Sequence, residues 1–173
     1  MVYHEIQPRK KTFKVLIVKI IFWTLGRAIF SLSKFDTQFK AELQTWPSNT
    51  TIILFVLPHG PNLSLIYEDN QLKRKKVLEK DANLAIYIKN IEIAFLTLTA
   101  QMGTLDAFIQ HRNLFRGDVP VAMSFIRCLN IVQSYLFPQF LVKRVIPRVP
   151  KIPRTRRYLG RIRVYLIGIP FGR

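Results

Sequence analysis

The sequence predicts an α+β domain in which a mainly antiparallel sheet is covered by helices on one side. Two observations predict this class. Apolar residues form short, strand-like runs between residues 50 and 88, and they recur at helical spacing before and after that stretch. The chain has 173 residues, of which 49% are hydrophobic, so it is long enough to bury a core without disulfides or structural metal. The single cysteine, Cys128, excludes a disulfide framework.

Residues 1–45 are predicted to be a basic, amphipathic helical segment. Apolar side chains recur at helical spacing from Val18 to Leu32, and the opposite face mixes cations with aromatic rings at Lys19, Trp23 and Arg27. The two cations disfavour a membrane span and a signal peptide. Their mixture with aromatic rings suits a membrane interface, and an ordinary helix with one face on the core is the alternative.

Short strands are predicted to follow. A run rich in β-branched residues is ended by the turn sequence Pro58-His59-Gly60-Pro61, and the polar residues 68–71 separate the two arms of a hairpin. The predicted strands are Thr51–Leu57, Leu63–Tyr67, Leu72–Leu78 and Ala85–Ile88.

Helices are predicted to take over after residue 90. Asn90 is a suitable N-cap for a helix that runs to Met102 and stops at Gly103. A second helix starts at Thr104, and a short strand covers Asn113–Arg116. The last helix of the domain is predicted to begin after Asp118 and to carry an apolar stripe of Phe125, Leu129, Val132, Leu136 and Phe140.

The sequence contains no recognisable enzyme or metal signature. The three histidines are scattered at positions 4, 59 and 111, without zinc-ligand spacing, and the glycines match no phosphate-binding loop. No Ser/His/Asp set, Cys/His set or carboxylate pair has an informative spacing. We therefore predict no catalytic residue, no metal site, no cofactor and no enzymatic activity.

The charge is large and lies at the two ends of the chain. The formal net charge is +17, and residues 143–173 contain ten basic and no acidic side chains, whereas residues 81–142 contain four of each. Prolines at 147, 150 and 153 argue against one continuous helix, so residues 143–173 are predicted to be a polybasic C-terminal tail. Such a tail binds an anionic partner, and an anionic membrane and a nucleic acid both fit.

Residues 50 to 140 carry a resemblance to a known family. The order of elements, together with several short motifs, resembles the sterol carrier protein type 2 domain. In that family a hairpin leads to a strand, helices, and a strand ending in Gly-Asp before the last helix. The matching motifs are Leu65-Ile66-Tyr67-Glu68-Asp69-Asn70, Asp81-Ala82-Asn83-Leu84-Ala85-Ile86, Asn90-Ile91-Glu92-Ile93-Ala94-Phe95, Ala107-Phe108 and Leu114-Phe115-Arg116-Gly117-Asp118. His111 departs from the pattern, because family members often have glycine there.

The resemblance implies a fold and a function. It implies a five-stranded sheet whose helices enclose an apolar cavity over residues 46–142, and a protein that shelters a lipid without breaking bonds in it. The ligand would be an acyl chain, a phospholipid, a polyprenyl quinone or a sterol. Large or flexible side chains are expected to line the cavity, with core packing as the alternative for each: Phe95, Leu98, Met102, Phe108, Met123, Ile126, Ile131 and Tyr135.

The charged termini complete the functional prediction. We expect a cytoplasmic protein that is peripherally attached to an anionic membrane and binds a lipid ligand. The alternatives are a nucleic-acid-associated protein that binds phosphates through its basic arms, and an accessory or scaffold subunit of a lipid-modifying complex. The residues expected to dock on the membrane are Lys19, Trp23, Arg27, Arg154, Arg156, Arg157, Arg161 and Arg163.

Overall fold

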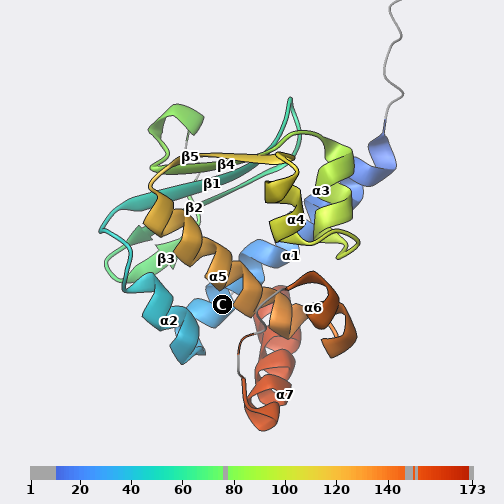
Figure 1. Ribbon diagram of the computed structural model, residues 1–173. Coiled ribbons are helices and arrows are strands. Elements are labelled where there is room, and N and C mark those ends of the chain that lie inside the picture. Colours follow the sequence, from blue (N-terminus) through green and yellow to red (C-terminus); the bar gives the residue numbers. More distant parts are fainter. Residues whose placement is uncertain (1–10, 76–77, 147–149, 151, 172–173) are drawn as a thin grey trace, which may run out of the picture.

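The fold is a five-stranded sheet with a layer of helices on one face (Figure 1). It is seen in a computed structural model that describes residues 11–75, 78–146, 150 and 152–171. The first half contains α1 (Thr12–Phe35), α2 (Thr37–Leu43), β1 (Thr50–Val56), β2 (Asn62–Glu68), β3 (Gln71–Lys73) and β4 (Leu84–Ile88). The second half contains α3 (Ile91–Leu98), α4 (Thr104–Ile109), β5 (Asn113–Gly117), α5 (Val119–Leu136), α6 (Gln139–Val145), α7 (Arg154–Arg163) and α8 (Ile169–Phe171).

The sheet is mixed, which corrects the prediction of a mainly antiparallel sheet. Its strand order is β3-β2-β1-β4-β5, and the central pair β1 and β4 is parallel, with Ile52 beside Leu84 and Val56 beside Ile88. The pairs on either side are antiparallel. The parallel pair arises because the chain leaves the edge strand β3, crosses the sheet, and enters β4 in the direction of β1. The α+β class and the number of strands agree with the prediction.

Described residues between β3 and β4 contact the sheet face that the helices leave free, and these residues are here called the crossing segment. Side chains alternate between the two faces of a strand, so Ser64 and Tyr87 point away from the helices. The Ser64 hydroxyl donates to the carbonyl of Lys75 at 2.6 Å, and the Tyr87 hydroxyl donates to Glu79 Oε1 at 2.8 Å. Arg116 adds a hydrogen bond to the Glu79 carbonyl at 2.7 Å. Residues 75 and 79 of the crossing segment are thereby tied to the outer face.

The helix α1 belongs to the same core as the sheet. It buries Val18, Leu25, Ile29 and Leu32 and leaves Lys19 in solvent, which is the arrangement that its helical period predicts. It contacts α3, α5 and β2. Within the described residues, α1 and α5 are long and apolar enough to cross a membrane, but about half of the most apolar stretch of each is buried inside the protein.

Several predicted boundaries differ from those observed. The strand β3 ends at Lys73, and Leu78, predicted as its end, is exposed. The helix α3 ends at Leu98 and not at Met102, because Ala100 has a φ of 60° and cannot continue a right-handed helix. The helix α5 ends at Leu136, since Pro138 disfavours a helical conformation at the residue before it. Phe140 therefore lies on α6, where its side chain is exposed.

The C-terminal segment is folded where the structure describes it. Residues 154–171 form one helical rod, in which a π-helical turn (Val164–Gly168) joins α7 to α8, and the rod begins after the last of the three prolines. It contacts α1 and α5 (Figure 1). Two glycines allow this close approach, because a Cβ on Gly160 would lie 2.3 Å from Tyr135 and one on Gly168 would lie 2.6 Å from Ser31. As the prolines predict, residues 143–173 do not form one continuous helix, but residues 154–171 are a packed helical rod where a tail was expected.

Candidate functional site

An apolar pocket lies between the inner face of the sheet and the helices. Its volume is about 340 Å³, which is within the size range of small-molecule sites, roughly 300–1,000 Å³. The wall combines α1, α3, α4 and α5 with the strands β1, β4 and β5 and with one residue of the C-terminal rod. The lining residues are Ile21, Thr24, Leu25, Leu54, Ile86, Ile88, Thr97, Leu98, Thr99, Phe108, Asn113, Ile126, Leu129, Gln133, Leu136, Phe137 and Tyr165.

Periodicity explains which side chains reach the pocket. On α5 the lining residues are Ile126, Leu129, Gln133 and Leu136, whose spacing of three or four residues keeps them on one helical face. On β4 the lining residues alternate, as side chains on one face of a strand must. The side chains that β1, β4 and α5 contribute are therefore aliphatic apart from Gln133, and no charged side chain among the described residues lines the pocket.

Three of the eight predicted lining residues form part of the pocket wall: Leu98, Phe108 and Ile126. Ile131 and Tyr135 are buried on another face of α5, about 140° and 180° around the helix from Ile126. Tyr135 instead donates a hydrogen bond from its hydroxyl to Asp36 Oδ2 at 2.7 Å. These two residues therefore pack in the core and do not reach the pocket.

The remaining three predicted lining residues also lie outside the pocket. Met123 is on the outer surface of α5, where the residue is 51% exposed. Phe95 is half-buried on α3, where the Lys14 ammonium lies 5.5 Å from the centre of its ring. Met102 is half-buried in the bend after α3, because that helix ends four residues earlier than predicted.

Some lining residues were missed from the sequence. Ile21 and Thr24 on α1, and Tyr165 in the C-terminal rod, reach the pocket through contacts between distant parts of the chain. Gln133 offered a signal, because it interrupts an otherwise apolar stripe between Leu129 and Leu136. A polar side chain at such a position is unusual enough to mark it as a candidate.

Most cations predicted to dock on a membrane make contacts within the protein. Arg156 donates to the Thr37 hydroxyl at 2.7 Å, and Arg161 donates to the carbonyls of residues 134, 135 and 137 at the C-terminal end of α5. Arg157 donates to the Ile152 carbonyl at 3.3 Å, and Arg163 lies 4.8 Å from the ring centre of Phe35. The side chain of Arg154 lies outside the part of the chain that the structure describes.

The three predicted docking residues on α1 are arranged differently. Lys19 is exposed, and Trp23 is 41% exposed. The Arg27 guanidinium stacks 4.3 Å from the centre of the Trp23 ring and donates to the carbonyls of Ile169 and Pro170 at 2.5 and 2.7 Å. Arg27 therefore joins α1 to the C-terminal rod as well as supporting the exposed indole.

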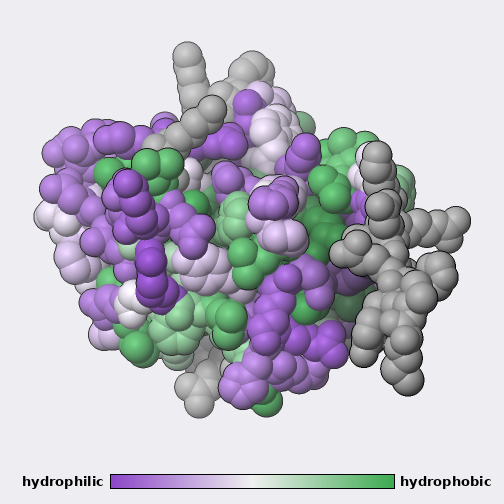
Figure 2. Space-filling view, turned by 90° about the horizontal axis from the view of Figure 1, so that it is seen from above, coloured by the Kyte–Doolittle hydropathy of each residue, from purple (hydrophilic) through white to green (hydrophobic). Residues whose placement is uncertain are grey.

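Two exposed apolar strips accompany these cations. The first lies on α1 and consists of Phe13, Leu16, Ile20 and Trp23. The second lies on the C-terminal rod and consists of Tyr158, Leu159, Ile162, Tyr165, Leu166 and Ile167. The sheet side of the molecule differs: Figure 2 shows mainly hydrophilic side chains there, with hydrophobic ones gathered toward α3 and α4.

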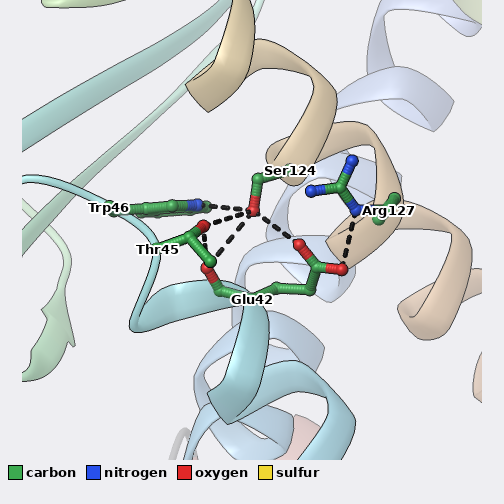
Figure 3. A network of polar contacts seen from close by, with 5 residues as sticks. All are labelled: Glu42, Thr45, Trp46, Ser124 and Arg127. Atoms are coloured by element: carbon green, nitrogen blue, oxygen red, sulfur yellow. Dashed lines mark hydrogen bonds and ion pairs between the residues drawn. The ribbon is translucent and has the colours of Figure 1, made fainter.

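A polar network joins α2 to α5 and has no catalytic geometry (Figure 3). The Ser124 hydroxyl donates to Glu42 Oε2 at 2.8 Å and accepts from the Trp46 indole at 2.8 Å. Arg127 donates to Glu42 Oε1 at 2.7 Å, and this hydrogen bond lowers the pKa of the Glu42 carboxyl. Ser124 is buried, so it cannot reach a substrate, and we assign the network a structural role.

The other reactive groups of the described residues form no site either. Burial raises the pKa of the Cys128 thiol, so the thiolate is suppressed at neutral pH. No group of three or more His, Cys, Asp or Glu side chains within the described residues is placed to hold a metal ion. The pocket is therefore the best candidate site in the described part of the chain.

Comparisons with solved structures find several similar chains, and two of them are described below. No family model matches the chain, and no curated protein matches it. One similar structure is described as "UbiJ-SCP2 Ubiquinone synthesis protein", with 14% identity, a TM-score of 0.46, and coverage of 69% of this chain and 98% of that one. The other is sterol carrier protein 2 like 2 from Aedes aegypti, with 12% identity, a TM-score of 0.34, and coverage of 56% and 94%. Both carry the name of the family that residues 50–140 resemble.

Proposed function

We propose that the protein binds a lipid-like molecule in the apolar pocket and exchanges it at an anionic membrane. The observation that carries the proposal is the pocket itself, which is lined mainly by apolar side chains and has no charged lining residue among those described. Moving an alkyl or isoprenoid chain from water into such a lining is worth about 0.8 kcal/mol for each buried CH₂ group. A pocket of this kind needs no catalytic group to retain its ligand.

The position of the pocket supports exchange with a membrane. Ile21 and Thr24 on α1 and Tyr165 on the C-terminal rod form part of its wall, and the same two elements carry the exposed apolar strips. Apolar side chains next to exposed cations such as Lys19 suit the interface of an anionic bilayer. The net charge of +17 adds attraction to that surface. We place the protein at the cytoplasmic face as a peripheral protein.

Ligand binding is tested by extracting lipids from the purified, thoroughly washed full-length protein and identifying them by mass spectrometry. The Ile126→Trp variant fills the pocket from α5, and Met123→Trp is its matched control, because that side chain points outward from the same helix. We expect a retained lipid in the wild type and in Met123→Trp, and its loss in Ile126→Trp. A folded wild type without lipid, or equal retention in all three proteins, would contradict the proposal.

Membrane docking is tested by flotation with vesicles of phosphatidylcholine alone and of phosphatidylcholine with phosphatidylglycerol. Ile20→Ser and Leu166→Ser remove one exposed apolar side chain from each strip, and Leu78→Ser is the control on the opposite side of the sheet. We expect only the two strip variants to lose binding that persists at high salt, because inserted apolar groups resist salt. Binding to vesicles that salt abolishes completely, together with copurified nucleic acid, would favour the nucleic-acid alternative.

A further inference from the structure

The polar atoms of the pocket are unusual because they lack partners. The described residues contain four buried side-chain nitrogen or oxygen atoms without a hydrogen bond, and three of these line the pocket: Thr97 Oγ1, Asn113 Oδ1 and Gln133 Oε1. Thr97 and Asn113 are each only 6% exposed. A buried polar atom without a partner is destabilising, and most such atoms in folded proteins are hydrogen-bonded. Their grouping in one cavity points to a partner that comes from outside the chain.

The three groups reach the pocket from three different elements. Thr97 lies on the buried face of α3, and Gln133 interrupts the aliphatic stripe of α5. Asn113 is the first residue of β5 and pairs with Ile88, so its side chain lies on the inner face of the sheet. Local structure does not require a polar residue at these positions, whereas the neighbouring Thr99 hydroxyl is satisfied by donating to the Phe95 carbonyl at 2.6 Å.

We propose that the pocket selects a ligand whose apolar chain ends in a neutral head group with a hydrogen-bond donor, such as an alcohol or a phenol. This inference rests on the proposed function, because it takes the pocket to be a ligand site. The two amide oxygens only accept hydrogen bonds, and the Thr97 hydroxyl both donates and accepts. A hydroxyl on the ligand satisfies at least one amide oxygen and can accept from Thr97 in return.

The same wall disfavours other head groups. An ionised carboxylate or phosphate would be buried opposite two carbonyl oxygens without any charged lining side chain to balance it, at a high desolvation penalty. An ether or a hydrocarbon end has no donor, so the amide oxygens stay unpaired. The neutral donor is the head group that leaves the fewest polar atoms of the pocket unsatisfied.

The test compares 1-decanol, decyl methyl ether and decanoate as competitors of the neutral fluorescent probe N-phenyl-1-naphthylamine on delipidated full-length protein. The alcohol and the ether share a chain and differ in the donor. We expect the wild type to bind decanol about tenfold more tightly than the ether, since one or two buried hydrogen bonds supply that difference. Decanoate is expected to bind more weakly than decanol.

The variant Thr97→Val/Asn113→Leu/Gln133→Met replaces the three unpartnered groups by apolar ones of similar shape. We expect it to retain the fluorescent probe, to unfold at the same or a higher urea concentration than the wild type, and to bind decanol and the ether within twofold of each other. Thr99→Val is the matched control, because it removes a lining hydroxyl that already has a partner. It should leave the preference for decanol unchanged.

The possible failures are distinguishable. If the wild type binds the probe and the chains but does not prefer decanol, water satisfies the polar atoms, and the head-group inference falls while the proposed function stands. Stronger binding of decanoate than of decanol would refute the neutral head. If neither the probe nor any chain binds to the folded protein, the pocket is not a lipid site and both proposals fall.

Discussion

Replacing Tyr135 with phenylalanine removes one hydrogen bond from the junction where the C-terminal rod meets α2 and α5. The substitution tests how much that bond stabilises the protein. Asp36, which is fully buried, accepts hydrogen bonds from the backbone N–H of Phe39 at 2.9 Å and from the Tyr135 hydroxyl at 2.7 Å. Arg156 from α7 lies 3.4 Å from the carboxylate oxygen that Tyr135 contacts. Burial and the hydrogen bond to Asp36 raise the pKa of Tyr135, so its hydroxyl remains a donor at neutral pH. The junction therefore joins α2, α5 and α7.

The expected loss follows from this geometry. Phenylalanine retains the aromatic ring, including its edge contact with Phe35, and removes only the hydroxyl. A buried hydrogen bond to a charged acceptor contributes about 1.5–3 kcal/mol to the free energy of unfolding. With an unfolding slope of about 2 kcal/mol per molar urea, the midpoint should fall by roughly 1 M. The carboxylate retains its backbone donor and Arg156, so the protein should still fold.

Urea unfolding followed by far-UV circular dichroism measures the effect. Tyr67→Phe is the matched control: Tyr67 is also buried, but its hydroxyl makes a longer bond, 3.3 Å, to the neutral amide of Asn70. We expect that control to lose under about 1 kcal/mol. In an Asp36→Asn background, which preserves the cap of α2, Tyr135→Phe should cost at least about 1 kcal/mol less than in the wild type. Equal losses in both backgrounds, or a Tyr135→Phe variant as stable as the wild type, would refute the reasoning.

Three further predictions concern other contacts. The hydrogen bond from Arg127 lowers the pKa of Glu42 below its ordinary value of 4.5, so its stabilisation is present at neutral pH and is lost as the pH falls through the lowered value. The difference in urea midpoint between the wild type and Glu42→Gln should therefore shrink from pH 7 to pH 3, and a constant difference would contradict this. Gly168→Val places a side chain against Ser31 and should lower the free energy of unfolding by about 1–3 kcal/mol, with faster tryptic cleavage of the rod; unchanged cleavage would show that the rod is not packed there. Because Cys128 is buried and its pKa raised, iodoacetamide should label it only at the rate of unfolding, and rapid labelling of the native protein would contradict its burial.

The local signals of the sequence were sufficient for most elements. The apolar period located α1 and α5, the turn after residue 57 ended β1, and Asn90 caps α3 by accepting from the Ile93 N–H at 2.9 Å. Asp118 occupies the N-cap position of α5, although its side chain makes no capping bond. Such signals depend on residues a few positions apart, so they can be recognised without knowing the fold.

The sequence was least informative where the outcome depends on pairing between distant residues. The prolines before residue 154 indicated an interrupted tail, but the rod after them is held by contacts that cross the chain: Gly160 against Tyr135, and Arg27 against the carbonyl of Ile169. The parallel pairing of β1 with β4 likewise joins strands that are separated in the sequence by β2 and β3. None of these three contacts leaves a periodic pattern in the sequence.

The sequence by itself determined the α+β class, the order of elements as far as α5, and the apolar stripe of α5 that reaches the pocket at Leu129. It also determined that the chain is strongly cationic, with a formal net charge of +17. The tertiary structure decided which side of each helix forms the pocket wall, so that Ile126 lines the pocket while Tyr135 supports α7. The reason is physical: periodicity defines which residues share a helical face, but only the packing of all the elements decides whether that face meets a neighbouring element, a cavity or solvent.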